Sequence, residues 1–166
     1  MRLRITRVAL WGLVLLCMAY IFYMSAKPAQ QSSQVSGQFI RSVAAAVTPD
    51  FSALSEDEQD AVVESFQHVV RKGAHFSIYL LLGVLCLLAM LTHRVKPGVR
   101  MGISLGICLL YAASDELHQL FIDGRSGQVS DVLLDFCGSA AGVLLTAGLA
   151  ALVCRHLRKR TSPVSS

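Results

Sequence analysis

Three short stretches of this chain place ionisable and amide side chains inside otherwise apolar sequence. Plotted at 100° per residue, each stretch gathers its polar side chains on one helical face, with Glu116 at the edge of the second face. The three faces consist of His68, Arg71, Lys72, His75 and Tyr79, then of Asp115, Glu116, His118 and Gln119, and finally of Asp131 and Asp135. Charged groups at membrane depth are energetically costly, so such faces normally point into a protein interior or a water-filled cavity.

The basic residues near these faces suit an anionic ligand. Arg71, Lys72 and Arg125 could bind phosphate or carboxylate, and arginine can do so through two parallel hydrogen bonds. The acidic residues would then hold these cations in place. We therefore predict a binding site composed of Arg71, Lys72, Tyr79, Gln119, Arg125, Asp131 and Asp135.

A catalytic and a purely structural interpretation remain open. His75 or His118 could act as a general base near neutral pH, oriented by Asp115 or Glu116. The two aspartates that open the last helix could carry a divalent metal through carboxylate oxygens, although we assign no metal site and leave cofactors undetermined. The sequence contains no HExxH, GxSxG or phosphate-loop motif. In the structural interpretation, the basic residues only neutralise the acidic ones.

Apolar helices must position these faces. The hydrophobic fraction is 54%, the charged fraction is 16% and the mean hydropathy is +0.54, with the apolar residues in long blocks. A spanning helix needs about 20 apolar residues, which predicts spans at about 8–24, 74–91, 101–122 and 132–153. The third block is long enough only if its helix continues through residues 114–119. The first block follows three arginines, as in a signal peptide, but it exceeds the usual 7–15 apolar residues, so we expect an uncleaved helix.

The fold class predicted from these blocks is all-α. We expect a polytopic membrane protein with four transmembrane helices in an antiparallel bundle, forming a single membrane domain over residues 1–166. Residues 155–166 are predicted to be a basic cytoplasmic tail. Gly138 and Gly142 form a GxxxG pattern, which allows close approach of two helices. The last two spans should form a hairpin, because the loop between them is short.

Basic residues predict which side of the membrane each end faces. With both termini in the cytoplasm, ten of the basic residues lie inside and five outside, as the positive-inside rule requires. The eleven acidic residues then all lie in the outer half, and the polar faces lie near the outer surface. The basic ends can contact anionic lipid headgroups, so no nucleic-acid partner is needed. The inner residues are Arg2, Arg4, Arg7, Arg94, Lys96, Arg100, Arg155, Arg158, Lys159 and Arg160.

The long connection between the first two spans is predicted to be partly helical. Ser55 and Glu58 form a capping box, and the helix that it opens is expected to run into the second span. Before it, one amphipathic helical face could lie along the outer leaflet. This face contains Val35, Phe39, Ile40, Val43 and Val47.

Several of these motifs together resemble the VanZ-like membrane family, over nearly the whole chain. The motifs are Phe22-Tyr23-Met24-Ser25, Arg71-Lys72-Gly73-Ala74-His75-Phe76 with Tyr79, Ser114-Asp115-Glu116-Leu117-His118-Gln119, Arg125-Ser126-Gly127, and Asp131-Val132-Leu133-Leu134-Asp135 with Gly138. The namesake of the family is associated with low-level resistance to the lipoglycopeptide teicoplanin. The resemblance implies a multi-pass protein of the bacterial cytoplasmic membrane that acts at the cell envelope, without specifying a reaction.

Three functions follow from the residues and the resemblance, in decreasing order of preference. The first is a non-enzymatic envelope factor whose outward-facing site binds a lipid headgroup, a lipid-linked precursor or a lipoglycopeptide. The second is a membrane hydrolase or transferase that acts on a lipid-linked envelope substrate. A transporter ranks third, because four spans without an internal repeat suit alternating access poorly unless the protein forms a homo-oligomer.

Overall fold

The computed structural model describes residues 2–27, 37, 40–122 and 127–161, and within these ranges the side chains of residues 3–27, 37, 40–122 and 127–158. The described residues form helices and connecting turns and contain no β-strand, which confirms the predicted all-α class. The elements are α1 (Arg2–Ser25), the 3-10 turn η1 (Phe51–Ala53), α3 (Glu56–Leu91), α4 (Pro97–Gln119) and α5 (Val129–Thr161), together with a helical stretch at residues 40–47.

Four helices are long and apolar enough to cross a membrane, and they are α1, α3, α4 and α5. The length and composition of these helices support a multi-pass membrane protein. α4 begins with Pro97 in its first turn. It stays helical through residues 114–119, so the third apolar block is long enough to span the membrane, as predicted. α5 continues beyond residue 153 to Thr161, so the predicted basic tail begins as helix.

α3 joins a polar first part to an apolar second part without a break. Ser55 caps it, because the Ser55 hydroxyl accepts from the Glu58 amide at 3.4 Å while the Glu58 carboxylate accepts from the Ser55 amide at 2.9 Å. The predicted capping box and uninterrupted helix are therefore confirmed. With 36 residues α3 is about 54 Å long, so its first part must extend beyond a hydrocarbon layer of about 30 Å.

The helical stretch at residues 40–47 packs against this first part of α3. Ile40 and Ala44 are buried there with Phe51 and Val63. The predicted apolar face is only partly the packed one, because Val43 and Val47, which share it with Ile40, are exposed. The other two members of that face lie outside the described residues.

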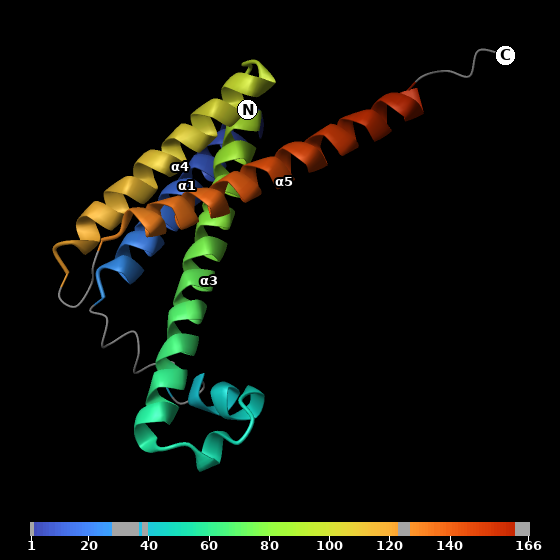
Figure 1. The fold of residues 1–166 in the computed structure, drawn as a ribbon. Coiled ribbons are helices and arrows are strands. Elements are labelled where there is room, and N and C mark those ends of the chain that lie inside the picture. The colour runs from blue at the N-terminus through green and yellow to red at the C-terminus, as the bar shows by residue number, and fades with distance from the viewer. Residues whose placement is uncertain (1, 28–36, 38–39, 123–126, 162–166) are drawn as a thin grey trace.

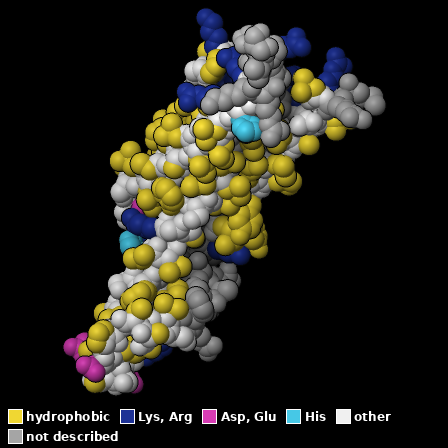
Figure 2. All heavy atoms as spheres, turned by 90° about the vertical axis from the view of Figure 1, so that its right-hand side faces the viewer, with side chains coloured by type: hydrophobic (Ala, Val, Ile, Leu, Met, Phe, Trp, Pro, Cys, Tyr) yellow, Lys and Arg dark blue, Asp and Glu magenta, His cyan; other side chains and the backbone are white. Residues whose placement is uncertain are grey.

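The second part of α3 is the centre of the helix bundle and contacts α1, α4 and α5 (Figure 1). α5 crosses α3, and its residues 151–158 are exposed as the helix leaves the bundle (Figure 1). On the face drawn in Figure 2, hydrophobic side chains gather between an upper end rich in Lys and Arg and a lower end with Asp and Glu. The bundle therefore consists of α1, α4, the second part of α3 and the first part of α5.

Candidate functional site

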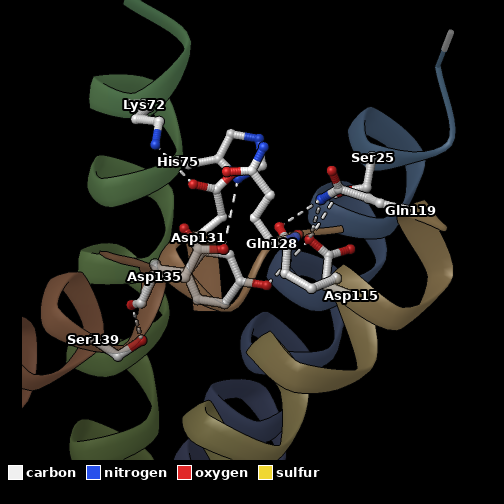
Figure 3. Close-up of polar contacts among 11 residues, drawn as sticks. Ser25, Lys72, His75, Asp115, Gln119, Gln128, Asp131, Asp135 and Ser139 are labelled. Atoms are coloured by element: carbon white, nitrogen blue, oxygen red, sulfur yellow. Dashed lines mark hydrogen bonds and ion pairs between the residues drawn. The ribbon is translucent and has the colours of Figure 1, made fainter. Parts of the chain in front are cut away.

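A polar cluster lies at the end of the bundle away from the N-terminus, where α4 ends and α5 begins (Figures 1 and 3). The side chains labelled in Figure 3 point toward one another from four helices. The members of the polar cluster are Ser25 from α1, Lys72, His75 and Tyr79 from α3, Asp115, Glu116 and Gln119 from α4, and Gln128, Asp131, Asp135 and Ser139 from α5 and the turn before it.

The crossing of α3 and α5 places Asp135 against α3. Glycines line this crossing: a Cβ on Gly138 or Gly142 would collide with carbonyl oxygens of α3, and one on Gly83 with a carbonyl oxygen of α5. Because only glycine allows such an approach, the two backbones meet closely, as small residues allow in membrane helix packing. The result is that the fully buried Asp135 faces His75, with 3.6 Å between its Oδ2 and the imidazole Nδ1.

Asp115 accepts several hydrogen bonds through a single carboxylate oxygen. Its Oδ2 accepts from the Ser25 hydroxyl at 2.8 Å, from the Tyr79 hydroxyl at 3.3 Å and from the Gln119 amide at 3.4 Å. Asp115 and Tyr79 are both buried. These three donors come from α1, α3 and α4, so Asp115 ties three spanning helices together at one oxygen atom.

Glu116 connects the end of α4 to the start of α5. Its Oε1 accepts from the Gln119 side chain at 3.1 Å, and its Oε2 accepts from the Gln128 backbone amide at 3.1 Å. The backbone also comes close here, since a Cβ on Gly127 would lie 2.6 Å from the carbonyl oxygen of Glu116. Glu116 therefore fixes where the chain enters α5.

Lys72 and Asp131 form the partly exposed edge of the cluster. The Lys72 Nζ donates to Asp131 Oδ1 at 2.9 Å, and their side chains are 33% and 23% exposed. Every other carboxylate of the cluster is more deeply buried. The ion pair thus lies between the buried carboxylates and the surroundings of the bundle.

Three buried carboxylate oxygens of the cluster have no hydrogen-bond partner, namely Oδ1 of Asp115 and both oxygens of Asp135. The 3.6 Å between His75 and Asp135 is too long for a hydrogen bond. One ligand atom from each of His75, Asp115 and Asp135 lies within 4.8 Å of those from the other two. Imidazole and carboxylate are common metal ligands, so these are the residues that could hold an ion.

A comparison with protein families matches residues 10–152 to VanZ/LLP1. This chain belongs to the VanZ/LLP1 family. The matched range includes every residue of the polar cluster, and the resemblance predicted from the motifs is confirmed. Comparisons with curated proteins and with solved structures returned no match.

In this VanZ/LLP1 chain, most of the sequence-predicted site residues lie in the polar cluster. They come from the second, third and fourth spans, as the helical faces predicted. Their functional roles remain predictions. The members that converge are Lys72, His75, Tyr79, Asp115, Glu116, Gln119, Asp131 and Asp135.

Three predicted residues are not among those that the structure brings together. The His118 ring stacks on Phe22 of α1, with 4.3 Å between the ring centroids, and its buried Nε2 has no hydrogen-bond partner. Arg71 is exposed, and its Nη2 lies 3.4 Å from Nδ1 of His68. Arg125 lies outside the described residues. A helical face can span more than 100°. Asp115 and His118 therefore share one predicted face, yet Asp115 points into the polar cluster and His118 packs on Phe22.

Sequence reasoning did not assign Ser25, Gln128 or Ser139 to the site. Ser25 belongs to a motif that carried the family resemblance, yet its role as a hydrogen-bond donor to Asp115 requires α1 to lie beside α4. Gln128 contributes its backbone amide, which no side-chain pattern indicates. The family motif was the one signal that could have pointed to Ser25.

Proposed function

We propose that this chain is a VanZ-like integral membrane protein of the bacterial cell envelope whose polar cluster faces outward and binds a lipid headgroup, a lipid-linked envelope precursor or a lipoglycopeptide of the teicoplanin kind. The observation that carries the proposal is the convergence of polar side chains from four helices at one end of the bundle. Membership of the VanZ/LLP1 family supports the link to the envelope and to glycopeptide resistance.

The depth of the cluster favours a ligand at the membrane surface. Asp115 lies 14 positions after Met101, or about 21 Å along the helix at 1.5 Å per residue, and thus within the last third of a hydrocarbon layer of about 30 Å. Headgroups of lipids and of lipid-linked precursors lie next to this depth. The exposed edge formed by Lys72 and Asp131 provides hydrogen-bonding groups for them.

The proposed orientation has both termini in the cytoplasm. The inner end, as we call the end with Arg7, gathers the start of α1 and the turn between α3 and α4, because the Arg7 guanidinium donates to the Thr92 carbonyl at 2.7 Å. Labelling of single cysteines in intact cells tests the proposal. A cysteine at Gln128 should react with a membrane-impermeant reagent from outside, and reaction from the cytoplasmic side alone would reject the orientation.

The functional test compares amide substitutions inside and outside the cluster. Asp115→Asn and Asp135→Asn should abolish the protein's effect on teicoplanin susceptibility in a suitable bacterial host while membrane abundance stays within about twofold. Asp60→Asn is the matched control, since Asp60 is 70% exposed and pairs with Arg41 outside the bundle. If the cluster is only structural, loss of the phenotype will follow loss of abundance in every variant, and the proposal fails.

A membrane enzyme acting on a lipid-linked substrate is the second candidate. The observation in its favour is the placement of His75 beside the buried Asp135, because a carboxylate can orient an imidazole that acts as a general base. His118 is less suited to this role, since its ring packs on Phe22. Release of phosphate or of a headgroup from radiolabelled membrane lipids, lost in His75→Gln, would favour the enzyme over the binding factor.

A further inference from the structure

We propose that His75, Asp115 and Asp135 bind one divalent first-row transition-metal ion, and that this ion supplies the positive charge to which an anionic headgroup binds. The role toward the headgroup rests on the proposed function, whereas binding of the ion to the protein does not.

The charges of the described cluster call for a cation. The described cluster contains one lysine, Lys72, and four carboxylic acid side chains, and the Lys72 Nζ is paired with the outermost of them at 2.9 Å. Like charges at such close range repel one another strongly in a medium of low polarity. A phosphate would add to this repulsion unless a bound cation lies between. The carboxylic acids are Asp115, Glu116, Asp131 and Asp135.

The unpartnered oxygens show where the cation belongs. Asp135 is completely buried and neither of its oxygens has a hydrogen-bond partner, while Oδ1 of the buried Asp115 has none either. A buried carboxylate oxygen without a partner is costly, and metal coordination is one of the ways in which such a group is stabilised. Asp131 lies four residues before Asp135 and could share its helical face. However, it is paired with Lys72, which makes it a poorer metal ligand.

The distances fit a shared ion better than direct pairing. His75 Nδ1 and Asp135 Oδ2 are 3.6 Å apart, which exceeds a hydrogen bond. Two ligand atoms on one tetrahedral ion, each about 2.1 Å from it, are about 3.4 Å apart. The full set of three ligand atoms lies within 4.8 Å, so binding requires the widest pair to approach by up to about 1.4 Å.

The surroundings of Asp115 already resemble those of a metal-bound carboxylate. Ser25, Tyr79 and Gln119 all donate to Oδ2, and this arrangement leaves Oδ1 available. Hydrogen bonds of this kind orient a metal-ligating carboxylate and are typical of metal sites. The donors are supplied by three helices, so ion binding would also stabilise the bundle.

The ligand set favours a particular class of ion. One imidazole with two carboxylates suits Zn²⁺ or Mn²⁺, whereas Mg²⁺ and Ca²⁺ prefer oxygen ligands alone. Three protein ligands leave at least one coordination position open, as in sites where a metal binds water or substrate. An oxygen atom of a phosphate headgroup is suited to that position.

Metal binding is tested on the full chain, purified in detergent with an affinity tag that contains no histidine. After exposure to Zn²⁺ or Mn²⁺ and removal of excess ion, elemental analysis should find about one ion per chain in the wild type. Asp135→Asn, Asp115→Asn and His75→Gln should lose it, while Asp60→Asn and His93→Gln should keep it. Tyr79→Phe should weaken binding by roughly 10-fold or more through loss of an orienting hydrogen bond.

Two results would overturn the metal site. One is a wild type that binds no ion, or binds it as weakly as the His75→Gln/Asp135→Asn double variant. The other is loss of the ion in Asp131→Asn but not in Asp115→Asn, which would assign the ion to different residues. Circular dichroism and size-exclusion profiles show whether each variant is folded, and the Asp→Asn variants keep the size and shape of the side chain that they replace.

A second measurement separates the ion from the headgroup. Phosphatidic acid is titrated against the protein in phosphatidylcholine nanodiscs with and without Zn²⁺. The proposal expects Zn²⁺ to raise the apparent affinity at least about 10-fold in the wild type and to have no effect in Asp135→Asn. Zn²⁺ binding without this increase would reject the headgroup role while leaving the metal site in place.

Discussion

The two ends of the helix bundle connect α1 to the rest of the protein in different ways. At the inner end, Arg7 donates to the carbonyl oxygen of Thr92 and the Trp11 indole donates to His93 at 3.1 Å. At the other end, Ser25 donates to Asp115. The contacts of Arg7 and Trp11 join complementary groups, although Nε of Arg100, near the start of α4, is buried without a hydrogen-bond partner. The polar cluster contains four carboxylic acids with one lysine, Lys72, and leaves three of their oxygens buried without a hydrogen-bond partner.

The contacts at the inner end show that helices can be held together without the charges of the polar cluster. A few neutral or complementary hydrogen bonds achieve the same connection at the inner end, with about 1 kcal/mol expected from each. Burying like charges opposes folding, so a chain that retains them gains something other than stability from them. This asymmetry between the ends is the reason to look for function in the polar cluster.

The largest expected effect comes from removing the helix crossing on which the polar cluster depends. Gly142→Leu should disrupt folding or assembly, because its side chain would collide with the backbone of α3 and force the helices apart. Gly148→Leu on the same helix is the matched control, since the space beside Gly148 is open. Yield and thermal stability in detergent provide the measurement. Equal yield and thermal stability of the two variants would contradict the close approach of α3 and α5 at Gly142.

Lys72→Ala should have the next largest effect, because it leaves Asp131 without its partner. Loss of one member of a buried pair costs about 3–5 kcal/mol, and of an exposed pair at most about 1 kcal/mol. For side chains that are 33% and 23% exposed we expect about 2 kcal/mol of destabilisation. Denaturant titration measures it, and Lys72→Ala/Asp131→Ala should recover part of the loss. A double variant no more stable than the single one would contradict the pairing.

Tyr79→Phe should destabilise by about 1 kcal/mol, since it removes one of three donors to Asp115 while keeping the buried ring. Thermal unfolding in detergent detects this change. Tyr111→Phe makes a useful comparison, because the Tyr111 hydroxyl donates to the carbonyl oxygen of Met18 and not to a carboxylate. If the polar cluster binds a ligand, only Tyr79→Phe should alter teicoplanin susceptibility beyond its effect on abundance.

The smallest effect is expected at the inner end. Trp11→Phe removes the hydrogen bond to His93 and should cost about 0.5–1 kcal/mol, with no change in envelope phenotype per molecule of protein. Immunoblotting of membranes beside susceptibility testing gives the comparison. If Trp11→Phe, at normal abundance, changed susceptibility as strongly as Asp135→Asn, then function could not be assigned to the polar cluster rather than to the inner end.

The long helices of this protein can be predicted from its amino-acid sequence. Apolar blocks predict the four long helices, and the capping box at Ser55 predicts where α3 begins, because both signals depend on residues close together in the chain. Helical periodicity also placed most of the polar residues on the correct faces. What periodicity could not supply is the rotation of each helix against its neighbours, so His118 was grouped with Asp115 although it packs on Phe22.

Which helix faces meet depends on the packing of whole helices. The glycines of α5 contact α3, whereas the GxxxG pattern predicts a close contact without naming its partner. That choice brings Asp135 to His75, and α1 then brings Ser25 to Asp115. These pairs are separated by many residues in the chain, and their distances depend on packing between whole helices. The residues of the polar cluster could therefore be predicted one helix at a time, but their grouping into an ion-binding geometry depends on the fold.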